Sequence, residues 1–178
     1  MEISKAQRDV RTTFLGGFVG QTVSATLWLG SAAVSTWHSR KLGISLLVIG
    51  GFFIFPAVQL VLRIMKRPKG LPAGHPMNAL AMQIAFTLPL SLPLVAAATM
   101  YRPAWFYPSF MIVLGAHYLP FTFLYGMQMF LALCGILVAA GLGLALYLPA
   151  PYSTGAWLTA AVLYLFAFIG WIQVKNER

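Results

Sequence analysis

The residues of this chain best suited to chemistry are a histidine and a tyrosine, His117 and Tyr118, inside the apolar segment GAHYLPFTFLYGM (115–127). An imidazole donates and accepts hydrogen bonds and titrates near neutral pH, so it can bind a ligand or act as a general base. Four glutamines occupy other apolar segments: Gln21, Gln59, Gln83 and Gln128. Because an unpaired polar side chain is costly in hydrocarbon, we expect these side chains to turn inward.

The sequence offers little support for other kinds of site. Its three histidines, His38, His75 and His117, are too widely spread to show metal-ligand spacing, and Cys134 is the only cysteine. We therefore expect no metal, no cofactor and no disulfide. The three acidic residues, Glu2, Asp9 and Glu177, all lie near the chain ends. The carboxylate that proton-coupled exchangers commonly carry inside a span is missing.

The chain as a whole has the composition of a membrane protein. Of its 178 residues, 60% are hydrophobic and 8% are charged, whereas an ordinary soluble domain has about a quarter charged residues. The mean hydropathy is +0.80. The apolar residues come in runs of about 20, enough to cross a hydrocarbon core roughly 30 Å thick. We predict an all-α, polytopic integral membrane protein in which residues 1–178 form a single transmembrane domain.

We predict a bundle of six transmembrane helices with short loops, with span ends good to a few residues. The spans are 13–35, 43–65, 79–100, 104–121, 127–148 and 156–174. The segment 119–126 is either a turn or re-entrant, since Pro120 and Gly126 argue against one long helix through it. A helix starting near Ser4 is expected to run straight into the first span, which is too long for a signal peptide.

The distribution of basic residues predicts the orientation. Nine of the 12 Lys and Arg residues fall at the two termini and in the loop between the second and third spans, including Arg178 at the C-terminus. Cytoplasmic loops carry such an excess, so both termini are expected to be cytoplasmic. The same placement explains the net charge of +9 through topology and contact with anionic lipids, and no nucleic-acid-binding pattern accompanies it. Short loops and the absence of glycosylation sequons favour a bacterial inner membrane.

Three functions remain open. With this topology, His117 and the four glutamines lie in the cytoplasmic halves of their spans. This predicts a neutral polar cavity, lined also by Tyr118, that binds or transports a largely apolar small molecule or lipid. The second possibility is a non-catalytic subunit or scaffold of a larger membrane complex, and the third is an intramembrane enzyme that uses His117. We expect a non-enzymatic role. The same polar side chains can also serve only as links between helices, each worth about 0.6 kcal/mol.

Small residues recur at intervals of four in two spans and suggest faces for close helix packing. They are Gly16, Gly20 and Ser24 in the first span, and Gly135, Ala139 and Gly143 in the fifth. Such stripes let helix backbones approach one another. Packing within one bundle is the simpler interpretation, and a homodimer or a partner membrane protein is the alternative.

Overall fold

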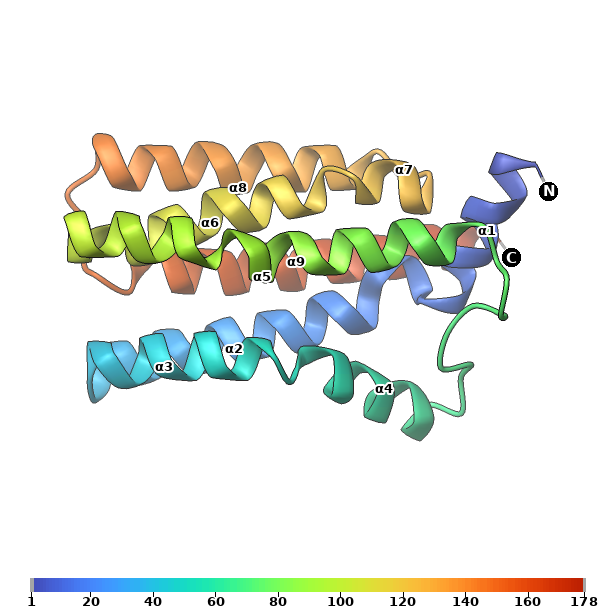
Figure 1. The fold of residues 1–178 in the computed structure, drawn as a ribbon, viewed down its shortest axis with the longest axis horizontal. Coiled ribbons are helices and arrows are strands. Elements are labelled where there is room, and N and C mark those ends of the chain that lie inside the picture. Colours follow the sequence, from blue (N-terminus) through green and yellow to red (C-terminus); the bar gives the residue numbers. More distant parts are fainter. Residues whose placement is uncertain (1, 178) are drawn as a thin grey trace.

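The prediction of an all-helical chain is confirmed. The computed structural model describes residues 2–177, in which helices occur and strands do not (Figure 1). Arg178, one of the basic residues counted for the cytoplasmic side, lies outside this range. The helices are α1 Ile3–Thr13, α2 Phe18–Trp37, α3 Arg40–Gly51, α4 Ile54–Ile64, α5 Met77–Tyr101, α6 Phe106–Tyr118, α7 Phe121–Tyr125, α8 Met129–Leu146 and α9 Thr154–Asn176, with short 3₁₀ turns η1 at Leu15–Gly17 and η2 at Pro103–Trp105.

Three of these helices, α5, α8 and α9, are each long and apolar enough to cross a membrane. The pair α3 and α4 makes a fourth candidate if it is one span, although its two halves are bent by 62°. Pro56 explains the break, because a proline in the first turn of α4 has no N–H to bond back and its ring excludes the carbonyl of Phe52. The predicted span 43–65 is therefore a broken helix.

The N-terminal helix does not run straight into the first long helix, contrary to expectation. Helix α1 ends at Thr13, and three consecutive residues, Leu15, Gly16 and Gly17, have φ values of 52°, 64° and 85°. These left-handed conformations separate α1 from α2. Gly16 lies against Gly170 of α9 so closely that a methyl group at Gly16 would overlap the Gly170 carbonyl. The break thus coincides with a contact that only glycine permits.

Helix α1 lies at the end of the bundle that carries both termini, and polar contacts hold it there (Figure 1). The Arg11 guanidinium donates to Glu177 at 2.7 Å, joining the two ends of the chain. The Gln7 amide donates to the backbone carbonyl of Phe123 in α7 at 2.6 Å. Asp9 lies 3.5 Å from His75 in the loop before α5. Helix α1 is therefore tied to α7, to the loop before α5 and to the end of α9.

The long helices pack in an order that differs from their order in the chain. Helix α5 packs on α6, α6 on α8, α8 on α9, α9 on α2, and α2 on α3. Helices α5 and α3–α4 therefore stand at the two ends of this series. The connections α2–α3, α5–α6 and α8–α9 lie at one end of the bundle, opposite the termini (Figure 1).

A buried polar contact joins three helices in the half of the bundle away from the termini. The Tyr107 side chain of α6 is fully buried, and its hydroxyl lies 2.7 Å from Ser31 and 2.6 Å from Ser35, both on α2. Ser31 also donates to the backbone carbonyl of Gly43 in α3 at 2.8 Å. These bonds hold α6 and α3 against α2 on one side of the cavity described below.

The segment 119–126 contains a short helix of its own. Helix α7 starts directly after Pro120 and ends at Gly126, whose φ of 65° is the left-handed conformation typical of a helix C-terminus. Its Leu124 and Tyr125 side chains are buried. The segment is thus an ordered turn of helix packed on the bundle.

Candidate ligand-binding cavity

A cavity of about 300 Å³ lies among α2, α3, α4, α5, α6 and α7. Its walls are largely apolar, with leucines such as Leu47, Leu88 and Leu114 and several aromatic rings. We call it the inner cavity, because its lining extends toward the end of the bundle that carries both termini. It is at the small end of the size range of ligand pockets, which typically combine apolar walls with a few polar groups.

The inner cavity brings together three of the six residues predicted as a site: Gln21, His117 and Tyr118. Gln21 lies on α2 and is only 2% exposed. Neither its amide oxygen nor its amide nitrogen has a hydrogen-bond partner among the described residues. An amide buried without partners carries a desolvation penalty of about 1–3 kcal/mol, which a bound polar group would relieve.

His117, on α6, is held by α5. Its Nδ1 atom lies 2.8 Å from the Thr87 hydroxyl oxygen, which is itself 2.7 Å from the backbone carbonyl oxygen of Ile84. Its ring also meets the Phe121 ring edge-on, with centroids 5.2 Å apart. One ring nitrogen is thus engaged with α5, and the imidazole is oriented by both polar and aromatic contacts.

Tyr118 is buried beside His117 and takes part in an aromatic cluster at the α7 end of the inner cavity. Tyr118 and Ser24 of α2 both line this cavity. The Tyr118 ring lies 5.3 Å from that of Phe121, which stacks on Tyr125 with centroids 5.6 Å apart. The spacing of four between positions 117, 121 and 125 aligns these rings along one side of the α6–α7 segment.

The other three predicted residues do not line the inner cavity. The Gln59 amide donates to the backbone carbonyl of Lys69 at 2.9 Å and so ties α4 to the following loop. Gln83 and Gln128 are both exposed. Gln83 lies on α5 two positions after Ala81, which does line the cavity, and two positions correspond to about 200° around a helix. Gln83 therefore faces away from it.

Several residues that line the cavity or orient its side chains were not predicted. Ser24 lies three positions after Gln21, on the same side of α2, so helical spacing alone was sufficient to suggest it. Thr87 was not foreseeable, because many hydroxyl residues lie at a similar depth. Phe52 and Phe55 also line the cavity, at and just after the bend between α3 and α4.

The chemistry available in the inner cavity is hydrogen bonding and apolar contact. None of the residues that line it is an aspartate, glutamate, lysine or arginine. Within residues 2–177, no three His, Cys, Asp or Glu side chains are grouped as a metal site would require. Thr87, the hydroxyl bonded to His117, does not line the cavity, whereas the Ser24 hydroxyl of α2 does.

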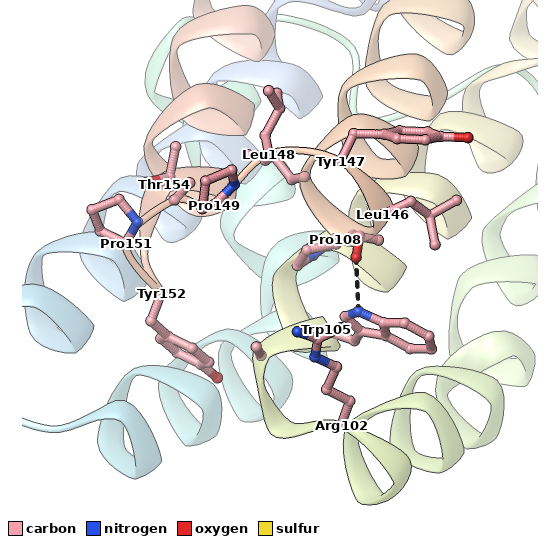
Figure 2. Close-up of a pocket in the computed structure, with 15 residues that line it drawn as sticks. Arg102, Trp105, Pro108, Leu146, Tyr147, Leu148, Pro149, Pro151, Tyr152 and Thr154 are labelled. Carbon is pink, nitrogen blue, oxygen red and sulfur yellow. Dashed lines mark hydrogen bonds between the residues drawn. The ribbon is translucent and has the colours of Figure 1, made fainter.

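A second cavity, of about 330 Å³, lies at the opposite end of the bundle, between the start of α6 and the α8–α9 connection (Figure 2). The Trp105 indole donates to the backbone carbonyl of Ala145 at 3.0 Å, the dashed line in Figure 2. Arg102 stacks near Trp105, with its guanidinium carbon 5.8 Å from the ring centre. Burial raises the pKa of Tyr152 in its wall to about 12. None of the predicted site residues lies here, so the inner cavity is the candidate site.

Comparison with curated proteins and with solved structures finds no match to this chain. One family does match it, over residues 3–174, and that range includes every helix that lines the inner cavity. The inner cavity is thus contained in the matched region. The chain belongs to this family, the family of unknown function DUF7010.

Proposed function

We propose that this protein binds a largely apolar small molecule or lipid in the inner cavity, either to hold it or to carry it across the membrane. The observation that carries the proposal is the Gln21 amide, which is buried in the wall of an apolar cavity with no partner among the described residues. A fold retains such a costly group most readily where a ligand pairs with it. The aromatic rings of Tyr118, Phe121 and Tyr125 add contact area for an apolar ligand.

We further propose that the chain crosses the membrane six times with both termini in the cytoplasm of a bacterium. The crossings are α2, α3–α4, α5, α6–α7, α8 and α9. Both termini lie at the same end of the bundle, as an even number of crossings requires (Figure 1). Most of the basic residues lie toward that end, in accordance with the positive-inside rule.

Cysteine labelling tests this topology. In a Cys134→Ser background, Ala150→Cys is expected to react with a membrane-impermeant maleimide in intact cells. Lys69→Cys is expected to react only after the cells are permeabilised. Both positions are exposed, so their reactivity depends on the side of the membrane rather than on burial. Labelling of Lys69→Cys in intact cells at the rate of Ala150→Cys would show the topology to be wrong.

A subunit or scaffold role also has one observation in its favour. Gly135 and Ala139 of α8 are exposed, and a methyl group at Gly135 would meet nothing within 4 Å. This is a smooth surface of the kind against which another helix packs. The two functions make different predictions for variants at Gly135 and at the cavity.

The deciding experiment places a large side chain in the inner cavity and compares its effect on ligand binding with that of the same side chain on the outer surface of α8. Gly20 of α2 lines the cavity, and a methyl group there also meets nothing within 4 Å. Gly20→Phe is therefore expected to occupy the cavity without a backbone clash, and Gly135→Phe is its matched control. Thermal unfolding of each protein in nanodiscs is followed across a library of lipids, sterols, porphyrins and apolar amines.

A ligand present at 100 times its Kd raises the stability of the wild type by about 2.7 kcal/mol. We expect Gly135→Phe to keep this stabilisation and Gly20→Phe to lose most of it. If the ligands of the library stabilise both variants equally, or stabilise none of the three proteins, the proposal of binding in the inner cavity is wrong. Loss of a co-purifying partner protein from Gly135→Phe alone would favour the subunit role instead.

A further inference from the structure

The hydrogen-bond network around His117 determines what the imidazole can offer a ligand. The Thr87 hydroxyl has one proton, and the Ile84 carbonyl oxygen at 2.7 Å can only accept it. Thr87 must then accept from His117, whose Nδ1 lies 2.8 Å away. This places the ring proton on Nδ1 and leaves Nε2 with a lone pair. Since His117 lines the inner cavity, a ligand bound there can donate a hydrogen bond to this nitrogen.

Gln21 lines the same cavity from α2 and adds a second polar group to its wall. Its amide has an oxygen that accepts and a nitrogen that donates, and neither has a partner within residues 2–177. A ligand group that both donates and accepts hydrogen bonds can pair with both residues, accepting from the Gln21 nitrogen and donating to His117. A group that only accepts, such as an ether oxygen, leaves the His117 lone pair without a donor.

The charge of the cavity wall limits the ligand further. The wall contains no side chain of Asp, Glu, Lys or Arg to pair with a charged group. Transfer of an unpaired charge into such an apolar, poorly solvated space is very costly. The polar group of the ligand is therefore uncharged.

The packing order indicates how the ligand enters. Helices α3–α4 and α5 stand at the two ends of the series α5–α6–α8–α9–α2–α3, and both line the inner cavity. Their cavity-lining residues remain partly open: Phe55 of α4 is 72% exposed, and Ala85 and Pro89 of α5 are exposed. The cavity thus opens sideways, between two apolar helices, toward the hydrocarbon of the bilayer. At about 300 Å³ it accommodates a headgroup and the first part of a chain, and the rest of the chain extends through this lateral gap.

On the basis of the proposed function, we infer that the ligand is a membrane-dissolved amphiphile with an uncharged headgroup that donates and accepts hydrogen bonds. Long-chain alcohols and primary amides are the chemical class. The headgroup enters first, between α3–α4 and α5. An alcohol, which has one proton, accepts from the Gln21 amide nitrogen and donates to His117 Nε2. A primary amide has two N–H protons and can also donate to the Gln21 amide oxygen.

A headgroup series with one common chain tests this inference. The probes are dodecanol, dodecanamide, 1-methoxydodecane, dodecanoate and dodecylammonium, each at equal mole fraction in phosphatidylcholine nanodiscs. Binding is measured by the thermal unfolding midpoint as a function of probe content. We expect dodecanol and dodecanamide to bind the wild type about tenfold more tightly than the methyl ether or either ion, as expected for one well-made hydrogen bond to a buried site.

The variant His117→Phe separates the headgroup assignment from simple apolar binding. It keeps an aromatic ring against Phe121 and leaves Thr87 bonded to Ile84, so folding should be retained and the unfolding midpoint of the empty variant checks this. The preference for dodecanol over its methyl ether is expected to fall below about threefold. Gly20→Phe is expected to weaken the binding of all five probes alike.

The outcomes distinguish this inference from the proposed function. If ions or the methyl ether bind as tightly as the alcohol, and Gly20→Phe still abolishes their binding, the headgroup assignment is wrong and the cavity remains a ligand site. Binding by none of the five probes also overturns the assignment, while the broader library decides the proposed function. An alcohol preference unchanged in His117→Phe would remove His117 from the site.

Discussion

Replacement of Gly170 by leucine is expected to destabilise the protein severely, with little or no folded material recovered. A side chain at this position would overlap the backbone carbonyl of Gly16 and approach the Met129 methyl to 2.8 Å. The backbone at Gly16 cannot move aside easily, because its φ of 64° belongs to the break between α1 and α2. Overpacking in a tight core costs about 1–3 kcal/mol even where side chains can adjust. The clash here is with the main chain, so we expect the loss of stability to lie in the upper part of that range or above it.

The measurement is the thermal unfolding midpoint in nanodiscs, with size-exclusion recovery as a measure of folded yield. Gly135→Leu is the matched control, because it introduces the same side chain into a helix where nothing lies within 4 Å. Gly16→Ala is expected to lower the unfolding midpoint, as Gly170→Leu does. It adds a methyl group to a residue in the left-handed conformation, which costs about 1–2 kcal/mol. Equal midpoints for Gly170→Leu and Gly135→Leu would mean that η1 does not pack on α9 as described.

Gln21→Met is expected to have opposite effects on stability and on ligand binding. The substitution removes a buried amide without partners and replaces it with an apolar side chain of similar length. Relief of the desolvation penalty is expected to raise the stability of the ligand-free protein by about 1–3 kcal/mol. Because the amide is then no longer available to pair with a headgroup, the affinity for an alcohol or an amide is expected to fall about tenfold. The stabilisation that these ligands give at a fixed concentration should fall accordingly.

Gln83→Met is the control for this experiment, because Gln83 is an exposed amide on α5 that does not line the inner cavity. It should change neither the unfolding midpoint of the empty protein nor ligand affinity. If Gln21→Met instead lowers the stability of the ligand-free protein, the Gln21 amide is satisfied in the resting state and the main support for the ligand site is lost.

The sequence by itself was sufficient to predict an all-helical chain with segments suited to a membrane. Both properties are local, because the length and hydropathy of an apolar run of about 20 residues do not depend on what the segment packs against. Helix breaks were foreseeable in kind, because Pro56 and Pro120 act on their own turn of helix. The break at residues 14–17 was not predicted, and in the structure it coincides with the close contact between Gly16 and the distant Gly170.

Only the tertiary structure decided which polar residues share the inner cavity. Hydropathy and topology predict the depth of a residue along its helix, and His117 and the glutamines were expected at similar depths. They do not predict the direction in which the residue points around the helix axis, since the rotation of each helix is set by the neighbours it packs on. Gln21 and Gln83 illustrate the difference: one lines the cavity and the other is exposed. The Thr87 contact that orients His117 likewise depends on how α5 and α6 pack, a relation between helices that neither segment encodes alone.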